Sequence, residues 1–248
     1  MIALFDSGNS RLHFGWWNGK SLTGTCHVPY PESPESLHEV VVGLMESGDM
    51  ERIVACSVSP VWRESLYAVL ERIAPEKLHV VRTSEDIGVR VAYDEPDTYG
   101  VDRAAADCAA YHYFHDSCVV VNAGTALTVD AVGREGGVAG GFIFPGRRKM
   151  SSVLAVYTDL PVVSLSGTEP ELGTSTVSSI AHAVSLGFAS AAGHLVARAS
   201  SAVDADGRII VTGGDAEFVV NHLNRPVLLR PDLVLEGLGV ASERLFCV

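Results

Sequence analysis

The sequence has few basic residues and few charged residues overall. Among its 248 residues, Lys and Arg number 18 against 30 Asp and Glu, which gives a formal net charge of −12. A surface of that sign repels polyanions such as DNA, so a nucleic-acid partner is not expected. Charged residues make up 19% of the chain and hydrophobic residues 47%, a composition that excludes disordered and coiled-coil classes. A globular α/β enzyme or binding protein remains.

Cysteine is also scarce, and long apolar runs are absent. The cysteines are scattered and include no C-x-x-C pair: Cys26, Cys56, Cys108, Cys118 and Cys247. We expect them to be reduced thiols of a cytoplasmic protein, and neither disulfides nor zinc ligands. The N-terminus reaches Asp6 early and has no basic region, which is unlike a secretory signal. Because no uninterrupted run approaches about eighteen apolar residues, a membrane partner is not expected either.

The chain repeats one α/β pattern. In each copy an apolar strand runs into a polar turn with a glycine and continues along a second strand. A shift of 116 positions (122 − 6) aligns the two turns: Asp6 with Asn122, Gly8 with Gly124, and Asn9 with Thr125. A shared hairpin could arise by coincidence, but we favour a duplicated unit whose hairpins face each other across a cleft. We therefore predict two α/β domains, 1–115 and 116–248.

Each of these hairpins could hold a phosphate group. Glycine lets the backbone approach an anion, the exposed amides donate to its oxygens, and the carboxylate holds a cation or a water. The turn Asp6-Ser7-Gly8-Asn9 is weak evidence alone, because Asp-x-Gly also occurs in ordinary turns. Two such hairpins, followed by Thr212-Gly213-Gly214 after a further strand, are typical of the superfamily of actin, sugar kinases and ATP-dependent chaperones.

The segment 93–103 brings reactive side chains to the start of a helix expected over 101–114. Pro96 and Gly100 shape a loop that delivers Asp102 and Arg103 to the first turn. A carboxylate next to a guanidinium suits a base that takes a hydroxyl proton beside a clamp for an anion. Taken alone, the pair more readily fits a carboxylate stabilised by the helix dipole, next to a solvated arginine.

Five short motifs occur in order along the chain. They are Asp6-x-Gly8-Asn9-Ser10, Tyr93-x-x-Pro96-x-x-x-Gly100-x-Asp102-Arg103, Gly124-Thr125-Ala126-x-Thr128-x-Asp130, Gly140-Gly141-x-Ile143-x-Pro145-Gly146 and Thr212-Gly213-Gly214-x-Ala216. Together they resemble the type III pantothenate kinase family, and the resemblance covers essentially the whole chain. It implies two related RNase H-like (actin-like ATPase) domains with a cleft between them.

The resemblance also implies an activity. It implies ATP-dependent phosphorylation of pantothenate at its terminal hydroxyl, the first step of coenzyme A biosynthesis. It implies a homodimer with pantothenate sites at the interface, and a need for Mg²⁺ and a monovalent cation, K⁺ or NH₄⁺. We expect pantothenate as the small-molecule partner in the cytoplasm.

Site residues follow from the matching motif positions. Asp102 would be the general base. Pantothenate would contact Tyr93, Gly100, Asp102 and Arg103, with Thr176 reaching it from the partner subunit. ATP and its phosphates would contact Asp6, Gly8, Asn9, Ser10, Gly124, Thr125 and Thr128, and Gly213 and Gly214 would lie near the adenosine. Asp6 and Asn122 would be the metal ligands.

Asn122 departs from the family pattern, which has an aspartate there. Asparagine keeps the shape and one oxygen ligand but loses the negative charge that holds a cation. The cation site could be relocated, for example to Asp130. Alternatively, kinase activity is weakened or lost, and the protein acts as a regulatory or accessory factor that binds nucleotide or pantothenate. A third hypothesis is a kinase of the same fold that acts on another small alcohol.

Three further features remain open in the sequence. His13 stands where several relatives have a basic residue, so it could meet a phosphate. Arg147-Arg148-Lys149 is expected in a solvated loop, with contact to ATP or a partner subunit as the alternative. His112-x-x-His115-Asp116 has a metal-like spacing, but its place at a helix end favours a solvated cap.

Overall fold

The computed structural model describes residues 1–46, 49–165 and 172–246 and divides into two compact units. The first unit comprises residues 1–115, 136–138 and the chain from Asp232 onward, and the second comprises 116–135 and 139–231. The segment from Asp232, which we assigned to the second half, packs in the first unit. There, Gly237 of α8 (Leu233–Phe246) approaches Ala105 of α4 (Val101–Phe114) so closely that a side chain would overlap its backbone.

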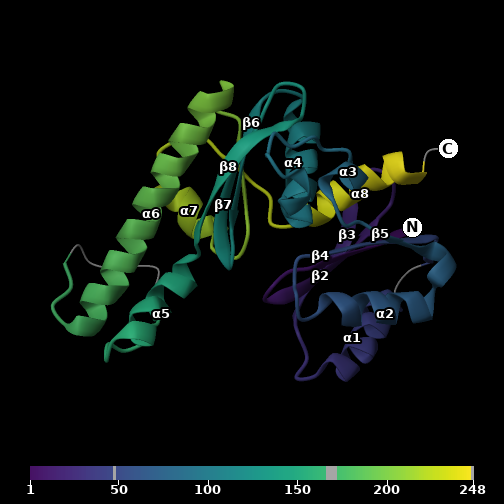
Figure 1. The fold of residues 1–248 in the computed structure, drawn as a ribbon, viewed down its shortest axis with the longest axis horizontal. Coiled ribbons are helices and arrows are strands. Elements are labelled where there is room, and N and C mark those ends of the chain that lie inside the picture. The colour runs from purple at the N-terminus through teal and green to yellow at the C-terminus, as the bar shows by residue number, and fades with distance from the viewer. Residues whose placement is uncertain (47–48, 166–171, 247–248) are drawn as a thin grey trace. The chain divides into compact units, whose positions relative to one another are not determined.

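The first unit is built on a five-stranded sheet with the order β3-β2-β1-β4-β5. The strands are β1 (Ile2–Ser7), β2 (Arg11–Trp17), β3 (Leu22–Pro29), β4 (Arg52–Ser57) and β5 (Leu78–Val80). Strand β1 pairs antiparallel with β2 and parallel with β4. Helices α1 (Leu37–Met45) and α2 (Arg63–Ile73) cover one face, and α4 and α8 cover the other (Figure 1). Phe5 packs in the core with α1 and α2, so the alternation along β1 turns Asp6 toward the α4 face.

The second unit repeats this sheet, with the order β10-β9-β6-β7-β8. Its strands are β6 (Cys118–Ala123), β7 (Ala126–Val132), β8 (Val138–Pro145), β9 (Ile209–Thr212) and β10 (Leu228–Leu229). Strand β6 pairs antiparallel with β7 and parallel with β9, as β1 does with β2 and β4. The fifth residue of β1, Asp6, pairs with His13 on one side and Cys56 on the other. The fifth residue of β6, Asn122, pairs in the same way with Thr128 and Thr212. The predicted fold of two related α/β halves is confirmed.

Helix α6 (Thr176–Val203) crosses the second sheet and supplies Phe188, Ala192 and Val196 to its core (Figure 1). By length and composition alone this helix could span a membrane. Serine, glycine and histidine interrupt its apolar residues, so no continuous run is visible in the sequence. A core helix passes the same test, and 44% of the most apolar window is buried, so this helix is only a weak indication of a membrane.

The remaining helices are short. They are α3 (Ser84–Ile87), α5 (Arg147–Tyr157), α7 (Ala216–His222) and three 3₁₀ helices, Pro34–Ser36, Pro75–Lys77 and Pro96–Thr98. The described cysteines, Cys26, Cys56, Cys108 and Cys118, are free thiols, and Cys247 lies outside the described residues.

Candidate functional site

Asp6, the last residue but one of β1, is a buried carboxylate. Only 4% of the residue is exposed. The Cys56 thiol donates to its Oδ1 at 3.6 Å, and His13 Nδ1 lies 3.9 Å from its Oδ2. Burial raises the pKa of Asp6 to about 6, because the ionised form is poorly solvated there. A bound cation would relieve that cost, so the residue fits the predicted role of metal ligand.

The backbone of the first hairpin is fixed from the other side of the strand. The Ser7 hydroxyl lies 2.7 Å from the Tyr30 hydroxyl and accepts from Ser57 at 3.0 Å. Tyr30 also donates to the Gly8 carbonyl at 2.8 Å. Ser7 therefore shapes the turn, while Asn9 and Ser10 lie exposed at its tip, where amide and hydroxyl donors can meet a ligand.

His13 stacks on a second histidine, His27, which contacts Asp232, an arrangement that the sequence did not predict. Its ring stacks on His27 at 4.6 Å between centroids, and His27 Nε2 lies 2.5 Å from Asp232 Oδ1. Burial, and then the charge of His27, lower the pKa of His13 to about 4, so the residue is neutral at pH 7. Only the register of β2 and β3, which pairs His13 with His27, could have signalled this arrangement.

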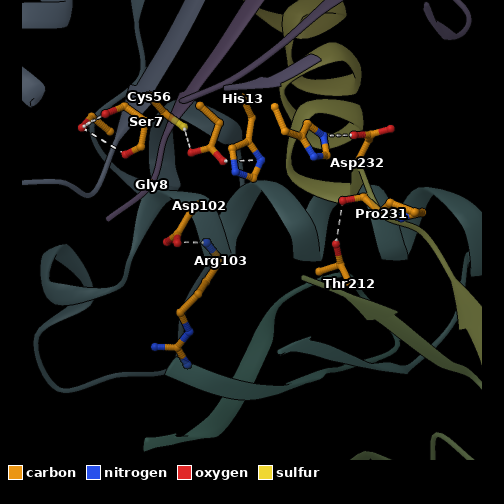
Figure 2. A network of polar contacts seen from close by, with 12 residues as sticks. Ser7, Gly8, His13, Cys56, Asp102, Arg103, Thr212, Pro231 and Asp232 are labelled. Atoms are coloured by element: carbon orange, nitrogen blue, oxygen red, sulfur yellow. Dashed lines mark hydrogen bonds and ion pairs between the residues drawn. The ribbon is translucent and has the colours of Figure 1, made fainter. Parts of the chain in front are cut away.

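The second predicted carboxylate, Asp102, stands in the first turn of α4. Its Oδ1 accepts from the backbone N–H of Arg103 at 2.8 Å. A Cβ at Gly100 would lie only 2.7 Å from that oxygen, so glycine makes room for the carboxylate. Burial raises the pKa of Cys56, and the charges of Asp6 and Asp102 raise it further. Both carboxylates therefore act on Cys56 at one end of the first sheet (Figure 2).

Arg103 is buried, which overturns its interpretation as a solvated arginine. Only 6% of the residue is exposed. Its Nη2 donates to the Tyr93 hydroxyl at 3.2 Å, and its Cζ lies 4.2 Å from the centroid of the Tyr99 ring. Tyr99 in turn donates to Asp107 at 2.6 Å. The structure thus joins Tyr93 and Arg103 into one aromatic–cation cluster, as the predicted substrate contacts require.

Two hollows flank this segment of the first unit. One has a volume of about 560 Å³ and is lined by Gly100, Ser57 and side chains of α2. The other, about 450 Å³ and more open, includes Tyr93 and Thr98. Each hollow holds one predicted substrate residue, and neither includes Asp102.

The second hairpin gathers the predicted nucleotide residues of the second unit. Gly124 N–H donates to Ala126 O at 2.9 Å and closes the turn. Gly213 has φ +97°, and a Cβ there would lie 2.6 Å from Asn122 Oδ1, so glycine is required on both grounds. The Asp215 N–H donates to Ala123 O at 2.8 Å. Two motifs about ninety residues apart in the sequence therefore form one surface.

The Thr128 hydroxyl lacks a hydrogen-bond partner among the described residues, which is consistent with a ligand binding there. Its Oγ1 is buried, and the residue faces Asn122 across the β6–β7 pair. Such orphaned groups are rare unless something else satisfies them. Asp130, the suggested replacement cation ligand, is fully buried opposite Val120, two residue pairs farther from the turn.

Arg147 is placed differently from our expectation of a solvated loop. It begins helix α5 and is 9% exposed, whereas the neighbouring Arg148 and Lys149 are exposed. Gly146, directly before it, lies so close to the Gly124 carbonyl that a side chain there would overlap it. The sequence shows three adjacent cations, and only the fold separates the buried one from the other two.

A family model for type III pantothenate kinases matches residues 2–198. The chain belongs to the type III pantothenate kinase family. A type III pantothenate kinase of Alkalilimnicola ehrlichii is 35% identical over 244 residues, covering 95% of each chain. Another, of Dehalococcoides mccartyi strain CBDB1, is 27% identical and covers 96% of this chain and 93% of its own. Membership makes the protein an ATP-dependent kinase of coenzyme A biosynthesis.

Solved structures resemble the kinase in fold. A Campylobacter jejuni protein described as a Baf family transcriptional activator is 21% identical, with a TM-score of 0.61, and covers 99% of this chain and 100% of its own. The ROK hexokinase of Thermus thermophilus is 16% identical, with a TM-score of 0.52, and covers 98% of each chain. At these identities the likeness shows the fold alone, so the first of them does not favour the regulatory alternative.

Thr176 opens helix α6 of the kinase. Ser175 caps the helix by accepting from the Ser178 N–H at 3.2 Å, and the Ser178 side chain accepts in return from the Ser175 N–H at 3.0 Å. Thr176 is exposed at this well-defined helix start. A contact to a partner's substrate is therefore sterically open to it.

The donor chemistry of the kinase fits Mg²⁺ bound to a nucleotide. Mg²⁺ takes oxygen ligands and is commonly held by one or two carboxylates together with substrate phosphates. Asp6 is a buried carboxylate of the first unit, and Asn122 carries an amide oxygen at the matching position of the second sheet. Among the residues that the structure describes, no group of three or more His, Cys, Asp or Glu could hold a metal, and this includes His112 and His115.

Proposed function

We propose that this kinase transfers the γ-phosphoryl group of ATP to the terminal hydroxyl of pantothenate, with Asp102 as the general base. The observation that carries the proposal is the placement of Asp102. Its carboxylate is held by the Arg103 N–H at 2.8 Å and has room because residue 100 is glycine. A buried cation, Arg103, stands directly beside it.

Each group of the first unit has a role in this reaction. Asp102 would accept the proton of the attacking hydroxyl, a contribution of about 10²–10⁴-fold in typical enzymes. Arg103 and Tyr93 would bind the carboxylate of pantothenate, since guanidinium and phenol donors suit that group. Phosphoryl transfer needs positioning and charge neutralisation more than covalent chemistry, so one base and an oriented acceptor suffice.

Each unit by itself carries proposed nucleotide-binding residues. The first unit would supply Asp6 and the turn Gly8-Asn9-Ser10. The second would supply Thr128, the turn Gly124-Thr125 and, near the adenosine, Gly213-Gly214. Mg²⁺, when bound, would neutralise charge on the phosphates, with Asp6 as its protein ligand. The buried, unpartnered Thr128 Oγ1 supports the assignment in the second unit.

Substitution of the base tests the mechanism. In Asp102→Asn we expect kcat to fall by about 10²–10⁴-fold, because the amide cannot accept the proton, while KM for pantothenate changes little. Asp94→Asn, an exposed carboxylate in the same segment, is the matched control and should retain activity. Full activity in Asp102→Asn, measured by steady-state phosphorylation of pantothenate, would remove the base assignment.

We also propose that the kinase uses K⁺ or NH₄⁺, held weakly because residue 122 is asparagine. A carboxylate at this place adds a charged oxygen ligand. Asn122→Asp should therefore reach half-maximal activation at a K⁺ or NH₄⁺ concentration at least about tenfold lower than the native chain requires. If native protein binds ATP but yields no phosphopantothenate with either cation, the regulatory alternative replaces the kinase proposal. A panel of other small alcohols tests the third hypothesis.

A homodimer is the assembly that the second unit favours. Exposed apolar side chains gather on α5 and α6, among them Val156 at 70% exposed, Tyr157 at 83% and Leu186 at 53%. Helix α5 packs on the first half of α6, where Met150 contacts the cluster of Ile180 and Val184. An apolar surface of this kind marks a protein interface. We propose that a second copy binds this surface in the cytoplasm and that Thr176 contacts the pantothenate of its partner.

A further inference from the structure

Arg147 is a buried cation whose hydrogen-bonding capacity is largely unused. Its Nε and Nη1 are buried, and neither has a hydrogen-bond partner among the described residues. Its one polar contact within that part of the chain is from Nη2 to Asp215 Oδ1, at 3.4 Å, which is long for a charge-assisted bond. Below it, the Phe218 ring centroid lies 4.1 Å from Cζ. The side chain is thus held in place by packing while two of its three nitrogens lack an acceptor.

An arrangement of this kind is costly in the absence of a ligand. Burying a guanidinium removes its hydration, and the loss is recovered only where acceptors satisfy its N–H groups. Arginine remains charged and cannot shed a proton to escape the cost. The neighbouring Arg148 and Lys149 avoid it by being exposed. The burial of Arg147 therefore calls for more acceptors than its single long contact with Asp215 provides.

The place of Arg147 identifies the source of those acceptors. The Gly146 N–H donates to Thr125 O at 3.2 Å, which seats the start of α5 against the second hairpin. Asp215, which touches the guanidinium, donates its own N–H to Ala123 O of the same hairpin. Arg147 is therefore linked through both neighbours to the turn where our proposed function places the phosphates of ATP.

We propose that Arg147 is a nucleotide-binding residue that donates from its unpartnered nitrogens to phosphate oxygens of ATP. This inference rests on the proposed function for the ligand, although the orphaned guanidinium itself does not. Planar guanidinium groups suit phosphate oxygens better than ammonium groups do. Thr128, whose Oγ1 is also buried without a partner among the described residues, lies on the strand that follows the same hairpin and marks the site independently.

The test compares Arg147→Met with Arg148→Met. Methionine keeps an unbranched apolar chain against Phe218 and removes the donors, and Arg148 is the exposed neighbour with the same charge. Binding of ATP, ADP and adenosine is measured by titration calorimetry, and KM values are measured by steady-state kinetics. We expect Arg147→Met to weaken ATP binding at least tenfold, about 1.4 kcal/mol, and to leave adenosine binding and KM for pantothenate unchanged. Arg148→Met should bind all three ligands like the native chain.

These binding measurements test the role of Arg147 independently of whether the protein phosphorylates pantothenate. Equal ATP affinity in Arg147→Met and Arg148→Met would overturn the proposal. An equal loss of affinity for ATP and for adenosine in Arg147→Met would also overturn it, because such a loss indicates a structural role. Because binding is read without turnover, a chain that fails to phosphorylate pantothenate still reports on Arg147. Arg147→Lys keeps the charge, so it serves where the methionine variant does not fold. We expect it to bind ATP more weakly than the native chain, and native affinity would count against a role for the guanidinium.

Discussion

The buried carboxylate of Asp6 is unfavourable for folding, and its proposed role as a metal ligand gives a reason for that burial. The residue stands near the end of β1 with Cys56 and His13 as its neighbours and His27 stacked behind His13. None of these described contacts is a strong ion pair, so the carboxylate is held in a position that its own hydration disfavours. That is expected where a ligand completes the site, because binding energy then offsets the cost of burial.

The first prediction is that Asp6→Asn stabilises the ligand-free protein at neutral pH. The native pKa is about 6 against the usual 3.8, so between these values the native state keeps a proton that the unfolded state has lost. The free energy of unfolding therefore falls as pH rises through this window, by up to roughly 3 kcal/mol. The asparagine of the variant does not titrate, so its advantage should grow from pH 4 to pH 6 and then level off.

Urea unfolding of native and Asp6→Asn proteins at pH 4, 6 and 8 measures this difference. A difference that stays constant across the three pH values would contradict the burial argument. The same variant should lose nearly all kinase activity, because the carboxylate proposed to hold Mg²⁺ is gone.

Gly100 carries the second prediction at this scale. Alanine there places Cβ 2.7 Å from Asp102 Oδ1, and the carboxylate, as the mobile end of a side chain, must turn away. We expect kcat to fall at least about tenfold while thermal stability changes little. Activity and melting temperature measured on one preparation separate the two effects. Native kcat would show that Asp102 needs no such space.

Among the elements, α8 matters most, since it joins the first unit from the far end of the chain. Its Gly237 lies against Ala105 of α4, and its Gly239 lies against the ring of Trp17 on β2. Glycine at these positions lets the helix approach α4 and the sheet at backbone distance. The α4 start that carries Asp102 is thus supported by residues more than a hundred positions away.

Gly237→Ala is therefore expected to destabilise the protein by about 1–3 kcal/mol or more, because the overlap is with backbone that cannot move aside. Gly43→Ala in α1 is the matched control. Apart from its chain neighbours and the backbone of its own helix, no atom of the described residues lies within 4 Å of a Cβ there, and alanine should stabilise that helix by about 0.5–1 kcal/mol. Chemical denaturation measures the free energy of unfolding of both variants. Similar changes in Gly237→Ala and Gly43→Ala would contradict the close packing of α8 on α4.

At the scale of the whole molecule, the exposed apolar side chains of α5 and α6 predict self-association. Tyr157→Asp should raise the dimer dissociation constant at least about 100-fold, because it buries a charge at an apolar interface. Light scattering after size exclusion measures the mass. Val61→Asp, at a residue 67% exposed in the first unit, should leave it unchanged. If Tyr157→Asp lowers kinase activity in parallel with the loss of dimer, the proposed contact of Thr176 with the pantothenate of the other subunit gains support. A native protein that is monomeric would contradict the proposed homodimer.

Much of this molecule was readable from local patterns. Helix 101–114 was predicted at its observed bounds, because it is an alanine-rich segment with a clear start. The shift that aligns Asp6 with Asn122 anticipated that both stand at the same position of equivalent sheets. Asp102, Arg103 and Tyr93 were identified as neighbours because one loop connects them.

The scarcity of basic residues by itself excludes a nucleic-acid partner. Composition and motifs determined the α/β class, the duplication and the family. Only the tertiary structure decided that Arg147, alone of three adjacent cations, is buried, that His27 and Asp232 stand behind His13, and that α8 belongs to the first unit. Burial and cross-strand contact depend on which segments pack together, and residues far apart in the chain leave no local pattern for that packing.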